Sequence, residues 1–327
     1  MKINKKLTLV AIAAIVLGTG LLAQGGKVEG NALRLKGGLY LGSVQSDLEK
    51  RYQLANIVGG QLDLDWKNKG GLGLLNQFGA DYYHGIGAGV LTHLLVGINV
   101  NRFPKSYEWN SVYQTGLGIK EGDYYMGFTD FTFGAVLSPQ ANLRITPKYI
   151  IRNYRHSLQT SSTYLGSPLG IGDEVLNARG TSGLLGVGLE YDVTPAVTVF
   201  ADVLVYGPFL LQGSGVYDRE SLTATTGYAT YQIGSGGFHM SSTKIAGGAT
   251  VQVLDDLRIF ASLDRESIKT QSTSPIGVSV TALPSGGASA GILIPTVVEA
   301  IAFGSEKRTE IFGLKFGVTY DINLGGK

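Results

Sequence analysis

Apolar and polar residues alternate without interruption in the segment 312–324, FGLKFGVTYDINL. Strict period-two alternation is typical of a β-strand whose two faces meet chemically different surroundings. Strands in soluble proteins average about five or six residues. At about 3.3 Å per residue and a tilt of about 40°, a strand of this length reaches roughly 33 Å, enough to cross a hydrocarbon core of about 30 Å. The length therefore favours lipid as the environment of the apolar face.

The same alternation recurs along the chain and predicts about 12 strands, with 10 and 14 as the outer limits. The predicted strands are 32–42, 54–66, 72–82, 86–100, 109–119, 124–137, 143–156, 183–193, 196–211, 242–254, 257–267 and 312–324. In the second half of the chain, short connections (138–142, 194–196, 255–256) alternate with long ones (157–182, 212–241, 268–306). Short periplasmic turns and long outer loops are typical of barrels in the outer membrane of bacteria.

The composition points to the same fold class. Charged residues make up 16% of the chain, against about 25% in ordinary soluble proteins. After the N-terminus no apolar run approaches the roughly 18 residues of a membrane-spanning helix, and a closed barrel is the other structure that satisfies its backbone in lipid. We therefore predict an all-β protein: a transmembrane antiparallel β-barrel that forms a single domain over residues 24–327.

Residues 1–23 have the pattern of a secretory signal peptide. Lys2, Lys5 and Lys6 precede the apolar run 7–22, and cleavage is expected near Ala23. The alternative, a permanent anchor helix, would be short and interrupted by two glycines. The absence of cysteine excludes disulfides and thiol metal sites. Removal of the signal leaves 24 basic against 25 acidic residues (27 less the three lysines, and 25), a balance that does not point to nucleic acid.

Aromatic residues and the last strand carry a resemblance to a known class. Trp66, Tyr191 and Tyr320 are expected near the periplasmic ends of their strands on the lipid-facing side, where aromatic girdles occur. The last strand contains a polar-x-Gly-x-x-aromatic-x-hydrophobic motif, formed by Lys315, Gly317, Tyr320 and Ile322, although the chain continues past it to Lys327. The chain thus resembles Gram-negative outer-membrane β-barrel proteins of the porin and channel class.

That resemblance implies a location and partners. It implies residence in the bacterial outer membrane, contact with outer-membrane lipid, and recognition of the last strand by the barrel assembly machinery. It does not identify a particular family.

Charged residues on the polar face of the predicted strands are the candidate lumen-lining and selectivity residues. They are Arg34, Lys36, Asp63, Asp65, Arg144, Lys148, Glu190, Asp192, Asp202, Lys244, Arg258, Asp264, Glu266 and Lys315. One interpretation is a charged pore that sorts solutes, and the other is cross-strand pairing that fills a narrow lumen. Basic and acidic residues occur together at each level of the predicted barrel, which favours cross-strand pairing over a pore that selects by charge. We expect Arg34 or Lys36 to reach Asp63 or Asp65, and Arg144 or Lys148 to reach Glu190 or Asp192.

No motif indicates an enzyme, a metal site or a cofactor. The four histidines, His84, His93, His156 and His239, are scattered, whereas a hydrolase needs histidine beside a nucleophile and a third orienting group. The glycine-rich segment 85–89 lacks the spacing of a nucleotide-binding loop, and we interpret it as tight strand packing.

The last long loop, residues 267–306, is unusually apolar for an outer loop. We expect it to lie over or within the outer mouth, and expect 277–282 or 292–298 to extend the barrel wall or form a short helix, since an exposed apolar surface of this size is unfavourable. The predicted function is a channel for passive passage of small solutes, partly occluded by this loop. The alternative is a non-enzymatic, surface-exposed binding protein, similar to an adhesin, that uses its long outer loops.

Overall fold

The computed structural model describes residues 30–46, 66–68, 77–112, 117–164, 171–206, 220–226, 229–234, 238–272, 277–282 and 307–325. The predicted signal peptide lies outside these residues. Among the described residues, none forms a helix that is long and apolar enough to cross a membrane. The described strands are β1 (Ala32–Ser46), β2 (Trp66–Asn68), β3 (Gln77–Ala88), β4 (Leu91–Val112), β5 (Leu117–Gln140), β6 (Leu143–Tyr164), β7 (Ile171–Thr194), β8 (Val197–Tyr206), β9 (Glu220–Thr226), β10 (Ala229–Gly234), β11 (Phe238–Gln252), β12 (Leu257–Ser272), β13 (Gly277–Ala282) and β14 (Lys307–Asn323).

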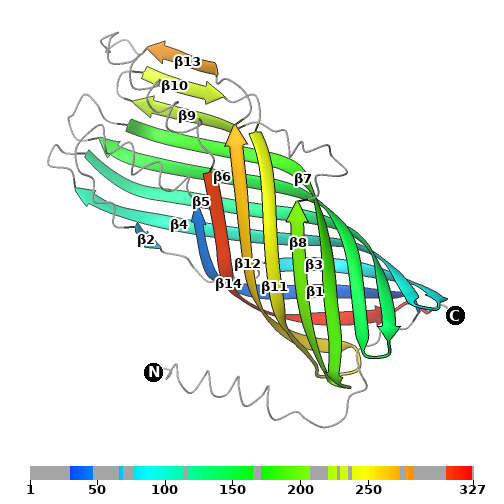
Figure 1. Cartoon of the computed structure of the whole chain (residues 1–327). Helices are drawn as coiled ribbons and strands as arrows, with labels where there is room; N and C mark the ends of the chain where they lie inside the picture. Colours follow the sequence, from blue (N-terminus) through cyan, green and yellow to red (C-terminus); the bar gives the residue numbers. More distant parts are fainter. Residues whose placement is uncertain are drawn as a thin grey trace, which may run out of the picture.

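Ten of these strands close into an antiparallel barrel (Figure 1). Their order around the barrel is β1, β3, β4, β5, β6, β7, β8, β11, β12 and β14, and β14 pairs with β1 to close the circle. The barrel class is thus confirmed, but the number of barrel strands is ten, not the 12 that the alternation favoured.

Two of the predicted strands account for the difference. Segment 109–119 is not a separate strand, because β4 continues to Val112 and β5 starts at Leu117, so this segment is the far end of their hairpin. Segment 54–66 is not a described barrel strand, because β1 pairs directly with β3. Only its last residue, Trp66, is described, in the short strand β2 beside β4.

Short turns join the strands at one end of the barrel, which we call the turn end. The turns are Gly89–Val90, Ala141–Asn142, Pro195–Ala196 and Val253–Asp256, and the last three confirm predicted short connections. The first lies in the glycine-rich segment for which tight packing was expected. Gly87 and Gly89 have φ angles of +64° and +62° with open space around them, so these two glycines serve backbone conformation and not close packing.

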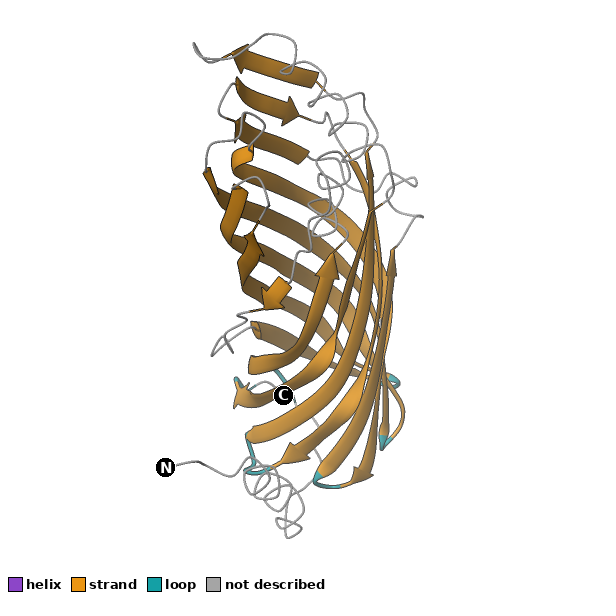
Figure 2. Ribbon diagram, turned by 90° about the vertical axis from the view of Figure 1, so that its left-hand side faces the viewer, coloured by secondary structure: helices purple, strands orange, loops and turns teal. Residues whose placement is uncertain are grey.

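At the opposite end, the upper end, four strands run far beyond the rest. Strands β4 to β7 are 22 to 24 residues long, or roughly 75 Å at about 3.3 Å per residue. The upper half of β7 leaves β8 and pairs with β9, which continues to β10 and β13 (Figure 2). We call this extension, made of β9, β10, β13 and the upper parts of β4 to β7, the outer sheet.

The outer sheet changes the interpretation of two long connections. Segment 157–182 is largely paired strand, since Ser157 lies opposite Asn177 in the β6–β7 hairpin. Segment 277–282 of the apolar last loop forms a strand, β13, but this strand pairs with β10 at the edge of the outer sheet and does not extend the barrel wall, in contrast to the expectation. The other candidate segment, 292–298, lies outside the described residues.

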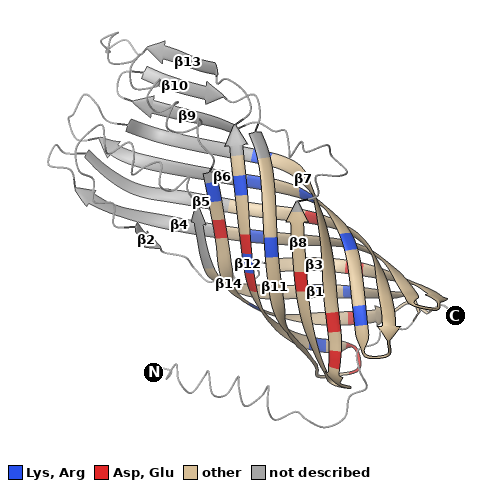
Figure 3. Cartoon of the chain, viewed as in Figure 1, with Lys and Arg blue, Asp and Glu red and all other residues tan. Residues whose placement is uncertain are grey.

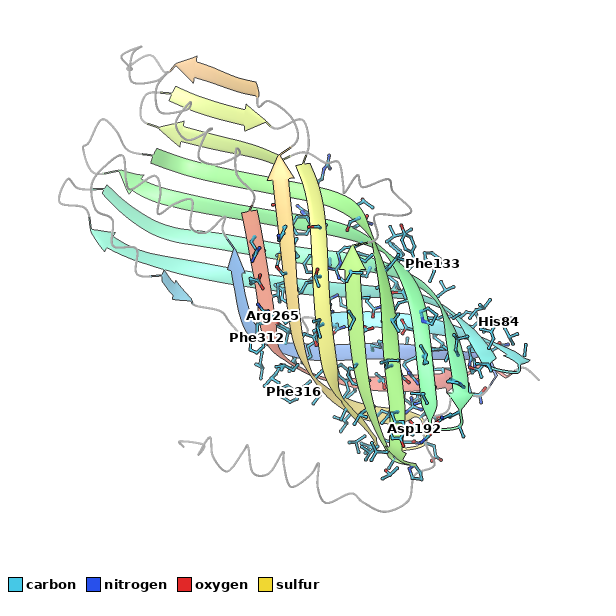
Figure 4. All side chains as sticks on the ribbon, in the orientation of Figure 1. His84, Phe133, Asp192, Arg265, Phe312 and Phe316 are labelled. Carbon is cyan, nitrogen blue, oxygen red and sulfur yellow. The ribbon has the colours of Figure 1, made fainter. Side chains whose placement is uncertain are left out.

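Large apolar side chains cover the outside of the barrel, which we call the apolar belt. All ten barrel strands contribute, and β14 alone exposes Phe312, Leu314, Phe316, Val318 and Tyr320. Figure 4 shows Phe133 and Phe316 projecting away from the barrel on opposite sides. An apolar exterior around a polar interior is the reverse of a soluble barrel and matches a wall in contact with lipid.

The predicted aromatic girdle is confirmed at two of its three positions. Tyr191 and Tyr320 face outward near the turn end, where they pair with Leu143 and Leu257 at the start of β6 and β12. Trp66 was placed wrongly, because its strand pairs at Trp109 in the upper part of β4.

Candidate functional site

Charged side chains of both signs line the interior of the described barrel, and Figure 3 shows basic and acidic residues distributed along its strands. The basic residues are Arg34, Lys36, Arg144, Lys148, Arg152, Lys244, Arg258 and Lys315, and the acidic residues are Asp81, Asp130, Glu190, Asp192, Asp202, Asp264, Glu266 and Asp321. Each of the eight basic and eight acidic groups takes part in at least one ion pair. The described interior therefore has no net charge.

The first group of ion pairs, the turn-end network, joins the first and last strands of the barrel. Arg34 donates from Nε and Nη2 to both carboxylate oxygens of Asp321, at 2.7 and 3.0 Å. Arg258 on β12 reaches the same carboxylate at 2.9 Å. Two-point guanidinium–carboxylate contacts fix geometry as well as charge, so this network ties three adjacent strands together.

Across the barrel, Arg144 on β6 holds two carboxylates of β7. It donates to Glu190 at 2.9 Å and to both oxygens of Asp192 at 2.6 Å, and Thr198 donates to Asp192 from β8 at 2.6 Å. This contact confirms the predicted pairing of Arg144 with Glu190 and Asp192. It follows from the local hairpin, which places Arg144 directly opposite Glu190.

The described partners of Arg34 and Lys36 are not the ones that the sequence led us to expect. Lys36 pairs with Asp81 on β3, and Arg34 pairs with Asp321 on β14, because these strands flank β1. Asp63 and Asp65 lie outside the described residues.

Between the two ends of the barrel, Lys148 on β6 reaches over β7 to Asp202 on β8 at 2.5 Å. Lys148 and Asp202 therefore both face the interior, as the alternation predicted.

The second group, the upper network, crosses the lumen. Arg152 on β6 donates from Nε and Nη2 to Asp130 on β5 at 2.7 and 2.8 Å, and from Nη1 to Glu266 on β12. Strands β7, β8 and β11 lie between β6 and β12, so the Arg152–Glu266 pair spans the barrel instead of joining neighbours. The Arg152 side chain is only 1% exposed.

The rest of the upper network lies on the opposite wall, beside Glu266. Ser242 on β11 donates to Glu266 at 2.7 Å. Asp264 on β12 accepts from Lys315 on β14 at 2.6 Å and lies 3.4 Å from Lys244 on β11. Lys244, Asp264, Glu266 and Lys315 were all predicted to face the lumen, and the structure brings these four together.

Aromatic rings face this charged wall from β1, β4, β5 and β6. Tyr40 packs edge-on to Phe103 (5.1 Å), Phe103 lies 5.9 Å from Phe128, and Phe128 stacks with Tyr154 at 5.8 Å. The Arg152 guanidinium lies 4.5 Å from the ring centre of Phe128, close enough for cation–π attraction. Arg152 thus connects the aromatic wall with the charged wall.

A small cavity remains between the two walls. Its lining includes Tyr40, Asn101, Phe128, Lys244 and Asp264, and its volume is about 10 Å³, roughly that of one water molecule. Tyr40 Oη and Asn101 Oδ1 are buried and have no hydrogen-bond partner within the described structure. Because an unpaired buried polar atom is costly, this cavity is suited to polar contents.

Inward-facing glycines make room for the large side chains. The Tyr40 ring lies over Gly313, where an added Cβ would come within 2.8 Å of the ring. Large and small residues alternate in this way in narrow barrels, whose interior is filled by side chains. Within the described part of the chain, the upper network and its aromatic wall therefore fill the lumen at this level around the small cavity.

Two of the four histidine side chains are described. His84 is exposed, and the buried ring of His93 lies edge-on to Tyr83 at 6.2 Å. The side chains of His156 and His239 are outside the described set. Among the described residues, three or more His, Asp or Glu side chains do not gather in a metal-binding arrangement.

Sequence reasoning missed four residues of these networks: Asp81, Asp130, Arg152 and Asp321. A signal for Arg152 was present, since Arg144, Lys148 and Arg152 follow one another at even spacing on the same face of β6. The residues of the proposed assembly motif are divided between the two faces of β14. Lys315 is buried in the upper network and Tyr320 is exposed on the apolar belt.

Some solved structures are similar to this chain at low sequence identity. No family model matches the sequence, and no curated protein matches it. The structure is similar to the outer membrane protease OmpT from Escherichia coli (TM-score 0.39, 11% identity, covering 90% of this chain and 94% of that one). It is also similar to the toluene transporter TodX of Pseudomonas putida (0.41, 10%, 91% and 90%) and to a FadL homologue of Pseudomonas aeruginosa (0.35, 8%, 91% and 91%).

These solved structures are outer-membrane β-barrel proteins, and this chain is likewise a closed β-barrel. The TM-scores are all below 0.5, and neither the fold nor the function of this chain is inferred from this likeness. Conclusions about function therefore depend on the chain's own geometry.

Proposed function

We propose that the protein is an outer-membrane channel for the passive passage of small solutes. The observation that carries this proposal is the combination of an apolar belt around a closed barrel with an interior lined by ion pairs from the turn end to the upper network. A barrel wall of this kind crosses lipid and encloses a polar route. The proposed function involves no covalent chemistry.

The upper network is the constriction of the proposed channel. At this level the described side chains leave a cavity of about 10 Å³ between the two walls, space for about one water molecule, so we expect solutes to pass only when these side chains move apart. The loosest contact is Lys244 with Asp264, at 3.4 Å, and it borders the cavity. We therefore expect brief openings with small currents, and weak preference between cations and anions because the lining is electrically balanced.

Planar-bilayer recording of the purified protein tests this function. The expected result is small, discrete current steps in symmetric KCl and a reversal potential near zero in a KCl gradient. A protein that refolds to a heat-modifiable barrel but produces no steps under any gradient would refute the channel.

Occlusion by the apolar last loop is a second, separate part of the proposal. One described piece of this loop, β13, pairs with β10 at the edge of the outer sheet. The proposal is that the loop reduces the current in addition to the upper network. Deletion of residues 274–300 should then raise single-channel conductance and reduce discrimination against large solutes. Unchanged conductance would leave the upper network as the sole constriction.

A second candidate function is surface binding, favoured by the outer sheet. Strands β9, β10 and β13 add a further sheet beyond the point where β8 ends (Figure 1), which the passage of small solutes alone does not require. Deletion of residues 213–237 should leave the barrel folded and its current unchanged, and should abolish adhesion of the purified protein to cell surfaces. Full adhesion after the deletion would exclude this role for the outer sheet.

A further inference from the structure

Two residues that border the small cavity in the upper network carry a polar atom without a hydrogen-bond partner in the described structure. These atoms are the hydroxyl oxygen of Tyr40, on β1, and Oδ1 of Asn101, on β4. Both residues are deeply buried, with 7% and 5% of their surface exposed. Because a buried polar atom without a partner is costly, two such residues at one cavity indicate that the cavity contains their partner.

A third group at this cavity is incompletely paired. The Lys244 ammonium, on β11, lies 3.4 Å from Oδ2 of Asp264, whereas the Lys315 ammonium lies 2.6 Å from the same oxygen. Charge-assisted hydrogen bonds between nitrogen and oxygen are about 2.7 to 2.9 Å long, and an ammonium has three N–H donors. Lys244 can therefore donate to a further acceptor in the cavity that it borders.

The carboxylates at the cavity, in contrast, already have close partners. Asp264 accepts from Ser262 at 2.9 Å in addition to Lys315. Glu266 accepts from Ser242 at 2.7 Å. Two lysines and two carboxylates border the cavity, so its surroundings have no net charge. An added cation or anion would unbalance these buried charges at a high cost, which favours an uncharged guest.

The size of the cavity restricts this guest further. Its volume of about 10 Å³ is close to the minimum that one water molecule requires, and a buried water molecule typically makes about three hydrogen bonds. A water molecule can donate to Asn101 Oδ1, accept from the Lys244 ammonium, and share a hydrogen bond with the Tyr40 hydroxyl. The three incompletely paired groups therefore match the capacity of one water molecule.

We propose that this cavity is a binding site for a single water molecule, held by Tyr40, Asn101 and Lys244. Strands β12 and β14 lie between β1 and β11, so the bound water connects the aromatic wall with the charged wall across the lumen. It does so beside the contact between Lys244 and Asp264, the loosest ion pair of the upper network. The site does not depend on conduction.

Urea unfolding of the full chain in phospholipid vesicles tests the site, because loss of the Tyr40 hydroxyl has different effects in a wet and in a dry cavity. With water bound, Tyr40→Phe removes a hydrogen bond and should raise the equilibrium constant for unfolding about three- to tenfold. In a dry cavity the same change removes an unpaired buried hydroxyl, and the constant should stay the same or fall. The latter result would overturn the proposal.

Ser182→Ala is the matched control. The Ser182 hydroxyl is likewise buried without a partner in the described structure, but this residue does not border the cavity. Its removal should leave the unfolding constant unchanged or lower it. An increase as large as that of Tyr40→Phe would show that the effect is not specific to the cavity and would overturn the assignment.

Asn101→Leu tests whether the two walls share one guest. Combined with Tyr40→Phe, it should raise the unfolding constant by less than the product of the two single effects, because the water leaves with its first partner. A simple product would contradict a shared water molecule.

A crystal structure of the unaltered protein identifies the guest even if a variant fails to refold. The expected result is one water molecule within hydrogen-bond distance of Tyr40 Oη and Asn101 Oδ1. A cavity without density would overturn the proposal. Anomalous scattering at this position from soaked bromide or rubidium would show an ion site and make the assignment of a neutral guest wrong.

Discussion

An arginine scan along the outer face of β14 would measure the depth of the apolar belt. The outward row runs from Phe312 to Leu324, with Val318 at its centre, and Glu310 above it is already part of an exposed ion pair. The row covers roughly 30 Å along the membrane normal, from about 3.3 Å per residue at a tilt of about 40°. Val318 should therefore lie near the midplane, and each step of two residues should move about 5 Å toward an interface.

Substitution by arginine should give a cost that depends on this depth. Arginine on the lipid face costs about 2 to 4 kcal/mol at the midplane and about 0 to 1 kcal/mol near the interfaces. We expect the largest loss for Val318→Arg, a similar or slightly smaller loss for Phe316→Arg, and the smallest for Phe312→Arg and Leu324→Arg. Val318→Thr, which changes polarity with little change in volume, serves as the control and should cost less than Val318→Arg.

The assay is reversible urea unfolding in phospholipid vesicles, followed by tryptophan fluorescence and by the shift in electrophoretic mobility of the folded barrel. Free energies of unfolding extrapolated to zero urea give the cost of each variant. A flat profile, with all four arginines costing less than about 1 kcal/mol, would refute the placement of this face in lipid. A maximum at Phe312 would show that the membrane lies higher on the barrel than the apolar belt indicates.

Three further changes test the interior by the same unfolding assay. Gly313→Val should destabilise the barrel by about 1 to 3 kcal/mol, because the new side chain would meet the Tyr40 ring and the β1 backbone. The control Gly89→Ala lies in open space with φ +62° and should cost only about 1 to 2 kcal/mol from backbone strain. Equal effects of larger residues at Gly89 and at Gly313 would contradict the close packing of Tyr40 over Gly313. Arg152→Met should cost about 3 to 5 kcal/mol, since it leaves two carboxylates buried without their partner, and a neutral result would exclude the cross-barrel pair. Arg144→Met should cost less, about 1 to 3 kcal/mol, because its partner Glu190 is 38% exposed. A greater cost for Arg144→Met than for Arg152→Met would contradict the conclusion that the upper network is the more deeply buried of the two.

The faces of the strands were predictable from sequence because inward and outward positions differ in chemistry at every second residue. Arg144, Lys148 and Lys315 face inward and Leu314 faces outward, as the alternation indicates. The number of strands was less accessible, since alternation continues in β4 and β5 beyond the barrel and says nothing about where a strand leaves the membrane. Segment 54–66 alternates equally well, yet the described neighbours of β1 are β3 and β14.

The partners of the charged residues were predictable only within hairpins. Arg144 and Glu190 belong to neighbouring strands joined by one connection, so their contact follows from local register. Arg34 and Asp321 are 287 positions apart, and they meet only because β14 closes the barrel against β1. The Arg152–Glu266 contact across the lumen depends on the barrel's circumference, which a pattern along one strand does not contain.

Single-channel recording of Glu266→Gln beside the unaltered protein tests the central claim most directly. The substitution keeps the size of the side chain and weakens the contact that Arg152 makes across the lumen, so the upper network should part more easily. The account predicts more frequent or larger current steps for Glu266→Gln, with Arg265→Gln on the outer surface behaving like the unaltered protein. Identical currents in all three proteins would contradict the claim that the upper network is the constriction of a channel.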